Sequence, residues 1–174
     1  MDIIETMLAR RSVRTFTQEP VTDEELNRIL TAALSSPTGK GKYPWELIAI
    51  RDADTLEKLS FCRQGSGKIL LGAKAAVVVV VDSEKTDTWI EDGSIVMTNM
   101  HLAASAIGLG SCWIQGRLRF AEDGEASEKA VQTLLGIPEK YKLVAVLAVG
   151  HPADVPAPHR PEDLHTEKIH YEKF

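Results

Sequence analysis

Apolar residues recur along the chain with two periods, one typical of helices and the other typical of strands. Spacings of three and four residues place side chains on one face of a helix. A first such stripe follows Asp2, a favourable N-cap residue, and consists of Ile3, Ile4, Met7 and Leu8. Two further helices are predicted to begin at capping residues, one at the capping box of Thr22 and Glu25 and one at Asp54 and Glu57. Three more are predicted to span 68–72, 88–107 and 127–135.

Continuous apolar runs rich in β-branched residues predict the strands of a buried sheet. The run at 75–81 ends in five valines, and we expect it to lie at the centre of the sheet. A second strong run spans 143–149, and shorter strands are predicted at 45–50 and 111–114. From His151 onward, prolines and charges predict an extended tail that has no partner among its own neighbours.

Length and composition exclude several classes of protein. The 174 residues, of which 44% are hydrophobic and 26% charged, fit one folded domain over 1–174. The formal net charge of -5 gives no general reason to bind nucleic acid or an anionic membrane, so an anion site must be local. No apolar run is long enough to cross a bilayer, and Met1–Glu5 is no secretory signal, which predicts a cytoplasmic protein.

Cys62 and Cys112 lack CxxC spacing and are expected to be reduced, structural thiols.

A cluster of cations follows the first predicted helix and reads Arg10-Arg11-Ser12-Val13-Arg14. Guanidinium groups donate paired, charge-assisted hydrogen bonds that match phosphate oxygens, and a serine hydroxyl adds a compact partner. The cluster therefore predicts an anion-binding site. The alternative is a solvated helix C-terminus, where cations only complement the helix dipole.

Other familiar motifs of catalysis do not fit. The segment 65–68 resembles part of a P-loop, but Cys62 replaces the first glycine and Ile69 follows the lysine. The glycines of 108–110 follow a helix rather than a strand, which argues against a dinucleotide fingerprint. The tail histidines lack metal-ligand spacing, and no nucleophile triad or carboxylate pair is visible. Any chemistry must then come from a cofactor.

Four short motifs follow one another in a fixed order over nearly the whole chain. They are the arginine cluster with Thr15-Phe16, Ser36-Pro37 followed by Pro44-Trp45, the segment 99–114, and Val149-Gly150-His151-Pro152 with Arg160-Pro161. Each motif alone is common, but in this order and spacing they resemble the FMN-dependent nitroreductase family. The resemblance implies an α+β fold in which a central, mainly antiparallel sheet is flanked by helices.

The resemblance also implies an intertwined homodimer that holds one FMN at each interface. In this family a tail such as 151–174 crosses to the partner subunit, which gives the tail the partner that it lacks locally. By similarity, the phosphate and ring edge of FMN are held by Arg10, Arg11, Ser12 and Arg14, with Arg160 as a further phosphate contact.

Three more residues match positions that lie near the flavin ring in the family. Gln115 and Gly116 fall where backbone amides approach the reactive N5, and a glycine permits that close approach. The alternative for this pair is a plain β-turn. Lys68 falls where some members place a cation near the pyrimidine end of the flavin, where it would stabilise the anionic reduced ring.

Two positions depart from the family's pattern. Many relatives carry an asparagine and a glutamine before the Pro44-Trp45 pair, where this chain has Gly41 and Tyr43. The flavin would lose a side-chain hydrogen bond there, and Tyr43 becomes a candidate for stacking near the substrate. The chain is also short for the family, which leaves the identity of the electron acceptor open.

The implied reaction is a two-step cycle. NADH or NADPH delivers a hydride to flavin N5 and departs, and a nitroaromatic, a quinone or a similar conjugated acceptor then takes the electrons. Lys40 and Lys42 are candidate contacts for the extra phosphate of NADPH. Three alternatives stay open: a flavin-binding carrier or regulatory protein without turnover, a dehydrogenase or reductive dehalogenase on the same fold, and an anion-binding scaffold without flavin.

Overall fold

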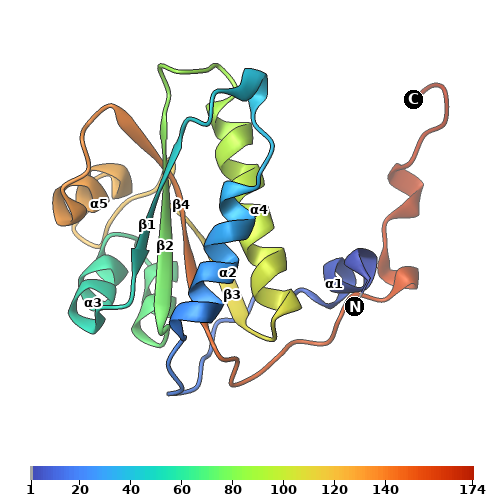
Figure 1. Ribbon diagram of the computed structural model, residues 1–174, viewed down its shortest axis with the longest axis horizontal. Helices are drawn as coiled ribbons and strands as arrows, with labels where there is room; N and C mark the ends of the chain where they lie inside the picture. The colour runs from blue at the N-terminus through green and yellow to red at the C-terminus, as the bar shows by residue number, and fades with distance from the viewer. Residues whose placement is uncertain (1) are drawn as a thin grey trace.

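The computed structural model describes residues 2–174, and its core is a four-stranded antiparallel sheet (Figure 1). The strands are β1 (Trp45–Ile50), β2 (Ala75–Asp82), β3 (Gly110–Gln115) and β4 (Tyr141–Gly150). Their order across the sheet is β1-β2-β4-β3, so the two longest strands lie at the centre and the two shorter ones at the edges. This arrangement confirms the prediction that the valine run forms a central strand.

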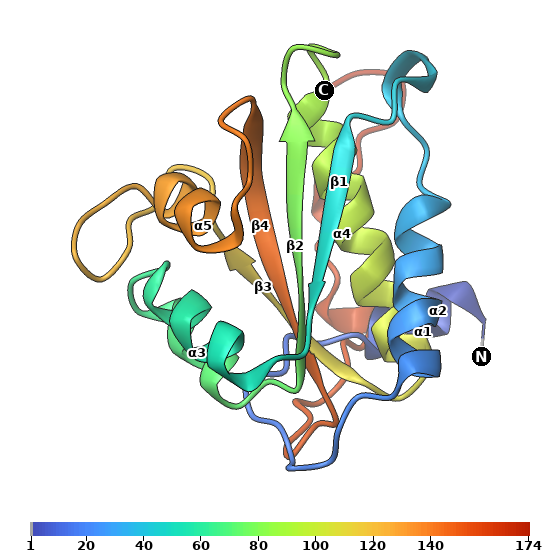
Figure 2. The ribbon, with the colours of Figure 1, turned by 60° about the vertical axis from the view of Figure 1, so that its left-hand side comes forward.

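Helices cover both faces of the sheet, as Figure 2 shows with the sheet seen nearly edge-on. Helices α2 (Asp23–Leu34) and α4 (Trp89–Ala106) lie on one face, and α3 (Ala53–Phe61) and α5 (Ser127–Leu135) lie on the other. Successive side chains of a strand point to opposite faces. The odd-numbered valines 77–81 therefore pack with α2 and α4, whereas Ala76, Val78 and Val80 pack with α3 and α5.

Close contact between α4 and the sheet depends on one glycine. A Cβ atom on Gly93 would lie 2.7 Å from Cγ2 of Val144 in β4 and 3.3 Å from Cγ1 of Val81 in β2. Interiors are packed densely enough that an added methyl group of this kind forces neighbouring groups apart. Gly93 thus sets the distance at which the long helix lies on the sheet.

The predicted elements are present, with differences at their ends. Helix α3 begins two residues earlier than Asp54 and Glu57 suggested, because the carboxylate of Asp52 caps it by accepting the Thr55 N–H at 2.8 Å. Several acidic residues compete for the cap position here, and the prediction of the helix start was wrong. The segment predicted as a short helix at 68–72 is a 3₁₀ helix, η2 (Ser66–Leu71).

The N-terminal helix α1 (Ile3–Ala9) and the C-terminal tail lie side by side, away from the sheet (Figure 1). The His159 N–H donates to the Leu8 carbonyl at 2.9 Å and joins the two segments. The tail contains two 3₁₀ turns, η3 (Pro161–Asp163) and η4 (Thr166–Lys168), and every residue of 157–174 is exposed. Large apolar side chains are left uncovered on both segments, namely Ile3, Ile4, Met7, Leu164, Ile169, Tyr171 and Phe174.

Between residues 2 and 174, no helix has both the length and the apolar character that crossing a membrane requires.

Candidate functional site

The arginine cluster lies against the first residues of β3. Ser12 forms a parallel bridge with Ser111, and the Val13 N–H donates to the Ser111 carbonyl at 2.9 Å. Helix α1 ends at Ala9 and has no basic residue in its last turn. The cluster is therefore held by pairing with a strand, and only Arg10, the C-cap residue of α1, lies where a cation complements the helix dipole.

The three guanidinium groups of the cluster lack acidic partners. Among residues 2–174, Arg10, Arg11 and Arg14 take part in no ion pair; Arg11 donates to the Ala157 carbonyl, and Arg14 donates to the Ser12 carbonyl at 3.3 Å. Cations gathered in one place repel one another, and an anion removes that repulsion while accepting their hydrogen bonds. The arrangement thus fits an external anion such as a phosphate.

A buried polar pair lies beneath the cluster. The ring Nδ1 of His101, in α4, is 2.8 Å from the hydroxyl of Ser111, and both residues are at least 94% buried (6% and 2% exposed). Burial, with a smaller contribution from the Arg10 charge, lowers the pKa of His101 from its ordinary value of 6.5 to about 4. The ring is therefore neutral at pH 7, adds no charge to the cationic cluster, and ties α4 to the strand that carries it.

The far end of β3 is fixed by side-chain and backbone hydrogen bonds. The Gln115 side chain accepts from Trp113 Nε1 at 2.8 Å and donates to the Arg117 carbonyl at 3.1 Å. The Gly116 N–H donates to the Val144 carbonyl at 3.3 Å, and a Cβ atom on Gly116 would lie 2.4 Å from Cδ2 of Leu143. Close packing on β4 thus requires a glycine at position 116, which is a structural reason for this residue that does not depend on a ligand.

Most of the predicted site residues line this one edge strand. The Ser12–Ser111 bridge is at one end of β3 and Gln115 is at the other, four residues or about 13 Å further along. Lys68 is exposed on η2, which contacts β3, and the Arg63 Nε–H donates to the Gln115 carbonyl at 3.0 Å from the same side.

Three predicted site residues lie elsewhere in the chain. Gly41 and Tyr43 are exposed in the loop before β1, which is the opposite edge strand from β3. Arg160 is in the tail, where its side chain pairs with Asp163 at 3.0 Å and with Glu162 at 3.5 Å. Within a single chain, Gly41 and Tyr43 are therefore not gathered with the arginine cluster. Arg160, in contrast, follows His159, whose N–H donates to the Leu8 carbonyl just before the cluster.

One residue that the sequence analysis missed organises the loop before β1. Asp92, 2% exposed in the first turn of α4, accepts the Gly39 N–H at 2.9 Å and the Thr38 hydroxyl at 3.1 Å. The loop contains the short 3₁₀ helix η1 (Gly39–Gly41), and Lys40, Gly41 and Tyr43 all have positive φ. A buried carboxylate holds this strained backbone in place. Its four-residue spacing to Val96 indicates that Asp92 lies on the buried face of α4, but this spacing does not identify its partners.

The two thiols are buried and free, in agreement with their prediction as structural cysteines. Burial raises the pKa of Cys62 to about 11 and also raises the pKa of Cys112. Thiols with raised pKa values are poor nucleophiles at neutral pH.

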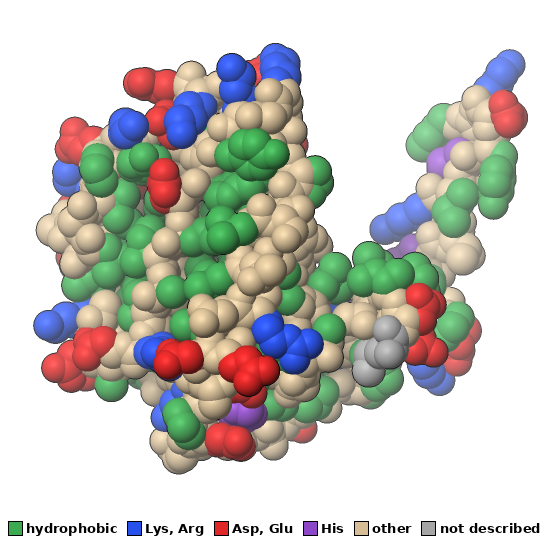
Figure 3. All heavy atoms as spheres, viewed as in Figure 1, with side chains coloured by type: hydrophobic (Ala, Val, Ile, Leu, Met, Phe, Trp, Pro, Cys, Tyr) green, Lys and Arg blue, Asp and Glu red, His purple; other side chains and the backbone are tan. Residues whose placement is uncertain are grey.

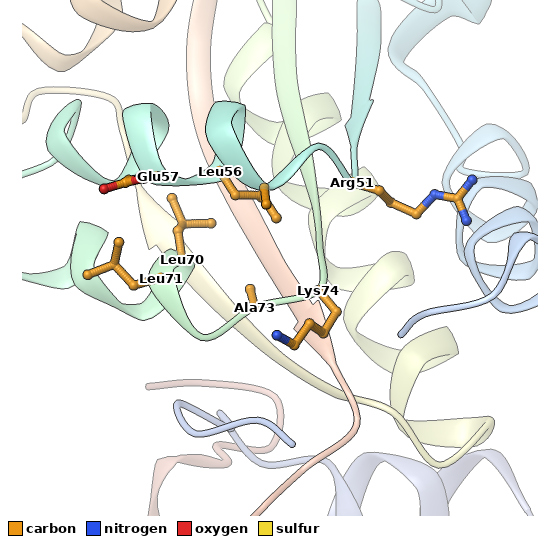
Figure 4. A pocket seen from close by; sticks show the side chains of 8 residues that line it. Arg51, Leu56, Glu57, Leu70, Leu71, Ala73 and Lys74 are labelled. Atoms are coloured by element: carbon orange, nitrogen blue, oxygen red, sulfur yellow. The ribbon is translucent and has the colours of Figure 1, made fainter. Parts of the chain in front are cut away.

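A hollow of about 320 Å³ opens between α3 and η2, away from the cluster (Figure 4). Leu56, Leu70 and Leu71 form its apolar wall. Its two cations already have partners, because Lys74 donates to Gln18 at 2.7 Å and Arg51, which points away from the leucines in Figure 4, pairs with Asp23. The β3 edge remains the stronger candidate for an anion site.

Known proteins resemble the chain over nearly its whole length. The model of the "Nitroreductase family" matches residues 7–62 and 61–151. An Archaeoglobus fulgidus protein named "Putative NADH dehydrogenase/NAD(P)H nitroreductase" is 33% identical over 99% of both chains. The structure of an FMN-dependent nitroreductase from Clostridium difficile superposes with a TM-score of 0.95 at 38% identity, covering 98% of this chain and 99% of that one. An NADPH:FMN oxidoreductase from Vibrio harveyi, complexed with NAD+, superposes with a TM-score of 0.82 at 28% identity, covering 99% of this chain and 77% of that one.

The lowered pKa of His101 predicts a specific loss of stability in acid. Because the folded chain protonates this ring only near pH 4, the unfolded chain takes up the proton first as the pH falls below about 6.5. The stability associated with the neutral ring is present above pH 6.5 and is lost as the pH falls towards 4. Lowering the pH from 7 to 4.5 should cost the wild type about 2 kcal/mol more than His101→Gln, measured by urea unfolding.

His165→Gln, in the exposed tail, is the matched control and should keep the wild-type pH dependence. Equal pH dependence in wild type and His101→Gln would contradict a neutral, buried His101.

Proposed function

The chain belongs to the nitroreductase family, and on this premise we propose that it is an FMN-dependent oxidoreductase that transfers electrons from NADH or NADPH to nitroaromatic, quinone or similar conjugated acceptors. The observation that carries the proposal is the set of three arginines without acidic partners, held by strand pairing at one end of β3. A phosphate is the ligand that such a set fits, and FMN carries one.

The chain's residues fit FMN at both ends of β3. Arg10, Arg11 and Arg14, with the Ser12 hydroxyl, would hold the phosphate through charge-assisted hydrogen bonds. Gln115 and Gly116 would face the ring at the other end, about 13 Å along the strand. The exposed ammonium of Lys68 beside β3 would stabilise negative charge on the reduced ring.

The protein's part in the reaction is to position the reactants. Bound FMN supplies the hydride-accepting and hydride-donating chemistry at N5. Around that position the chain contributes a backbone held by the Val144 carbonyl and a Gln115 side chain held by Trp113 and Arg117. Rigid positioning of this kind favours direct transfer between aligned reactants. No side chain is required as a general acid or base.

We further propose that the working unit is a homodimer in which each tail crosses to the partner. Among residues 2–174, no strand pairs with the outer edge of β1. The groove beside this edge, about 540 Å³, is lined by apolar side chains that include Leu30, Trp45 and Leu47. Figure 3 shows hydrophobic side chains gathered over β1 and α2 on this face. The tail supplies matching apolar groups, Tyr171 and Phe174, that are uncovered within one chain.

Dimer formation would also explain the scattered site residues. Gly41 and Tyr43 adjoin β1, and Gly116 follows β3, so the width of the sheet, roughly 14 Å over three strand spacings, separates them in one chain. A site that uses both groups can be assembled when they come from different subunits. Arg160, in the crossing tail, would reach a phosphate in the same way.

The purified protein should be yellow and should contain one FMN per chain. Charge-assisted hydrogen bonds contribute about 1.5–3 kcal/mol each, so Arg10→Ala and Arg14→Ala should each weaken FMN affinity roughly 10- to 100-fold. Quenching of flavin fluorescence by titrated apoprotein measures this change.

Arg28→Ala is the matched control, because Arg28 is an exposed arginine on α2 outside the candidate site. Unchanged FMN affinity in both cluster variants would refute the assignment of the phosphate site.

Steady-state kinetics test the proposed activity. The holoprotein should oxidise NADH or NADPH continuously when menadione, a quinone, is added. Because the donor must leave before the acceptor enters, double-reciprocal plots at several acceptor concentrations should be parallel. Intersecting lines would contradict the two-step cycle, and FMN binding without oxidation of either donor would show a carrier instead of an enzyme.

The dimer is tested on the full-length chain in solution. Sedimentation equilibrium should give twice the 19.1 kDa mass of the chain. The proposed dimer buries two aromatic side chains that are exposed in one chain, so replacing them by serine removes several kcal/mol of apolar burial. Tyr171→Ser/Phe174→Ser should therefore weaken the dimer at least tenfold. Glu172→Gln, between them, should not. A monomeric wild type, or a dimer unaffected by the double variant, would exclude the crossing tail.

A further inference from the structure

A second hollow, of about 610 Å³, opens immediately beyond the end of β3. Its wall is formed by the loop 117–120, by Trp89 at the start of α4, and by Glu128 and Lys142 from α5 and β4. None of the family motifs recognised in the sequence falls in this loop. The hollow is larger than the one between α3 and η2, and its lining differs in chemistry because aromatic and cationic groups alternate in it.

The lining carries more positive than negative charge. Arg117, Arg119 and Lys142 face one carboxylate, Glu128, whose oxygens already accept the Leu143 N–H at 2.9 Å and lie 3.6 Å from the Lys142 ammonium. In the part of the chain that the structure describes, neither Arg117 nor Arg119 forms an ion pair. A local positive charge in a chain of net charge -5 attracts an anion to this place.

Figure 3 shows that Lys and Arg side chains gather on one end of the molecule, where β2 ends and β4 begins. Lys142 belongs to this end, because it is the second residue of β4. Carboxylates partner other lysines of this end, as Asp82 partners Lys140, so the cations of the hollow itself are the ones that an approaching anion meets without a close carboxylate: Arg117 and Arg119.

Aromatic faces accompany the cations. The guanidinium carbon of Arg117 lies 5.6 Å from the centre of the Trp89 ring, within cation–π distance, and Trp89 itself is only half buried. Phe120 is 59% exposed on the same loop. Large exposed aromatic groups beside cations form the surface on which a flat, phosphorylated ring system binds, because stacking and charge act together.

The position of the loop is fixed relative to the flavin end of β3. Arg117 directly follows Gly116, and the N–H groups of both residues donate to the Val144 carbonyl, at 3.1 and 3.3 Å. The Arg119 guanidinium donates to the Leu118 carbonyl at 2.9 Å and so remains next to the hollow. A ligand whose reactive end lies at Gly116 can extend its other end into this hollow.

We propose that the hollow binds the 2′-phosphoadenosine end of NADPH, and that Arg119 and Lys142 determine a preference for NADPH over NADH. In this proposal, which rests on the proposed function, the two cations bind the 2′-phosphate and the rings of Trp89 and Phe120 contact the adenine. Planar guanidinium and compact ammonium groups both match a phosphate monoester, which NADH lacks. Lys40 and Lys42 are a weaker basis for the preference, because within one chain they lie in the exposed loop before β1, the opposite edge strand from β3.

The first test uses adenosine 2′,5′-bisphosphate, which carries the 2′-phosphate, and AMP, which does not. Calorimetric titration of the FMN-loaded wild type should show tighter binding of the bisphosphate. Arg119→Gln and Lys142→Gln should each weaken bisphosphate binding roughly tenfold, which corresponds to about 1.4 kcal/mol, and should leave AMP binding unchanged. Arg119→Lys, which keeps the charge, should recover most of the affinity, and Arg28→Gln on α2 is the matched control.

The second test is the ratio of KM values for the two donors. Each variant should raise KM for NADPH about as much as it weakens bisphosphate binding, with kcat, KM for NADH and FMN content unchanged. Equal binding of bisphosphate and AMP by the wild type, or an unchanged KM ratio in Arg119→Gln/Lys142→Gln, would overturn the proposal. The proposed function would be refuted by different results, namely the absence of FMN or the absence of oxidation of NADH and NADPH. The calorimetric titration measures binding and needs no turnover, so the two proposals can fail independently.

Discussion

The antiparallel pairing of β3 with the central strand β4 is the interaction on which the candidate site depends. Through this pairing, Ser111 is placed where it can anchor the arginine cluster and His101, and Gly116 is placed where Leu143 excludes any side chain. Because β3 is an edge strand, one side is bound to the core and the other is free to hold the segment 10–14. A rigid strand thus gives fixed positions to groups that would otherwise be on loops.

Electrostatics explains why this cluster suits a ligand better than a structural role. Three guanidinium groups without acidic partners repel one another, and either a neighbouring carboxylate or a bound anion would remove that repulsion. The chain has 25 acidic residues to 20 basic ones, so suitable carboxylates are abundant. The ion pair between Arg51 and Asp23, for example, lies beside β1, at the opposite edge of the sheet from β3. The unpaired cations of the cluster fit the proposed phosphate ligand.

The sequence predicted the elements better than their ends or their long-range contacts. The valine run of β2 and the apolar run of β4 were unmistakable because strands covered on both faces tolerate no polar residue. The cap of α3 was misplaced because Asp52 and Asp54 are equally good N-cap residues and only the backbone selects one. Asp92 was missed for another reason. Its partners, Thr38 and Gly39, are more than fifty residues away, and no local pattern reports a contact of that kind.

The opposite positions of β1 and β3 bear on the proposed homodimer. The strained loop that Asp92 holds adjoins β1, whereas the arginine cluster adjoins β3, and two central strands separate them. Backbone strain of this kind is retained when the surrounding structure fixes it for a purpose. Within one subunit the loop faces no ligand group. In the proposed dimer, the partner's tail would cover the free edge of β1, and the same loop would meet the partner's flavin. The uncovered apolar tail and the strained polar loop would then have a single explanation.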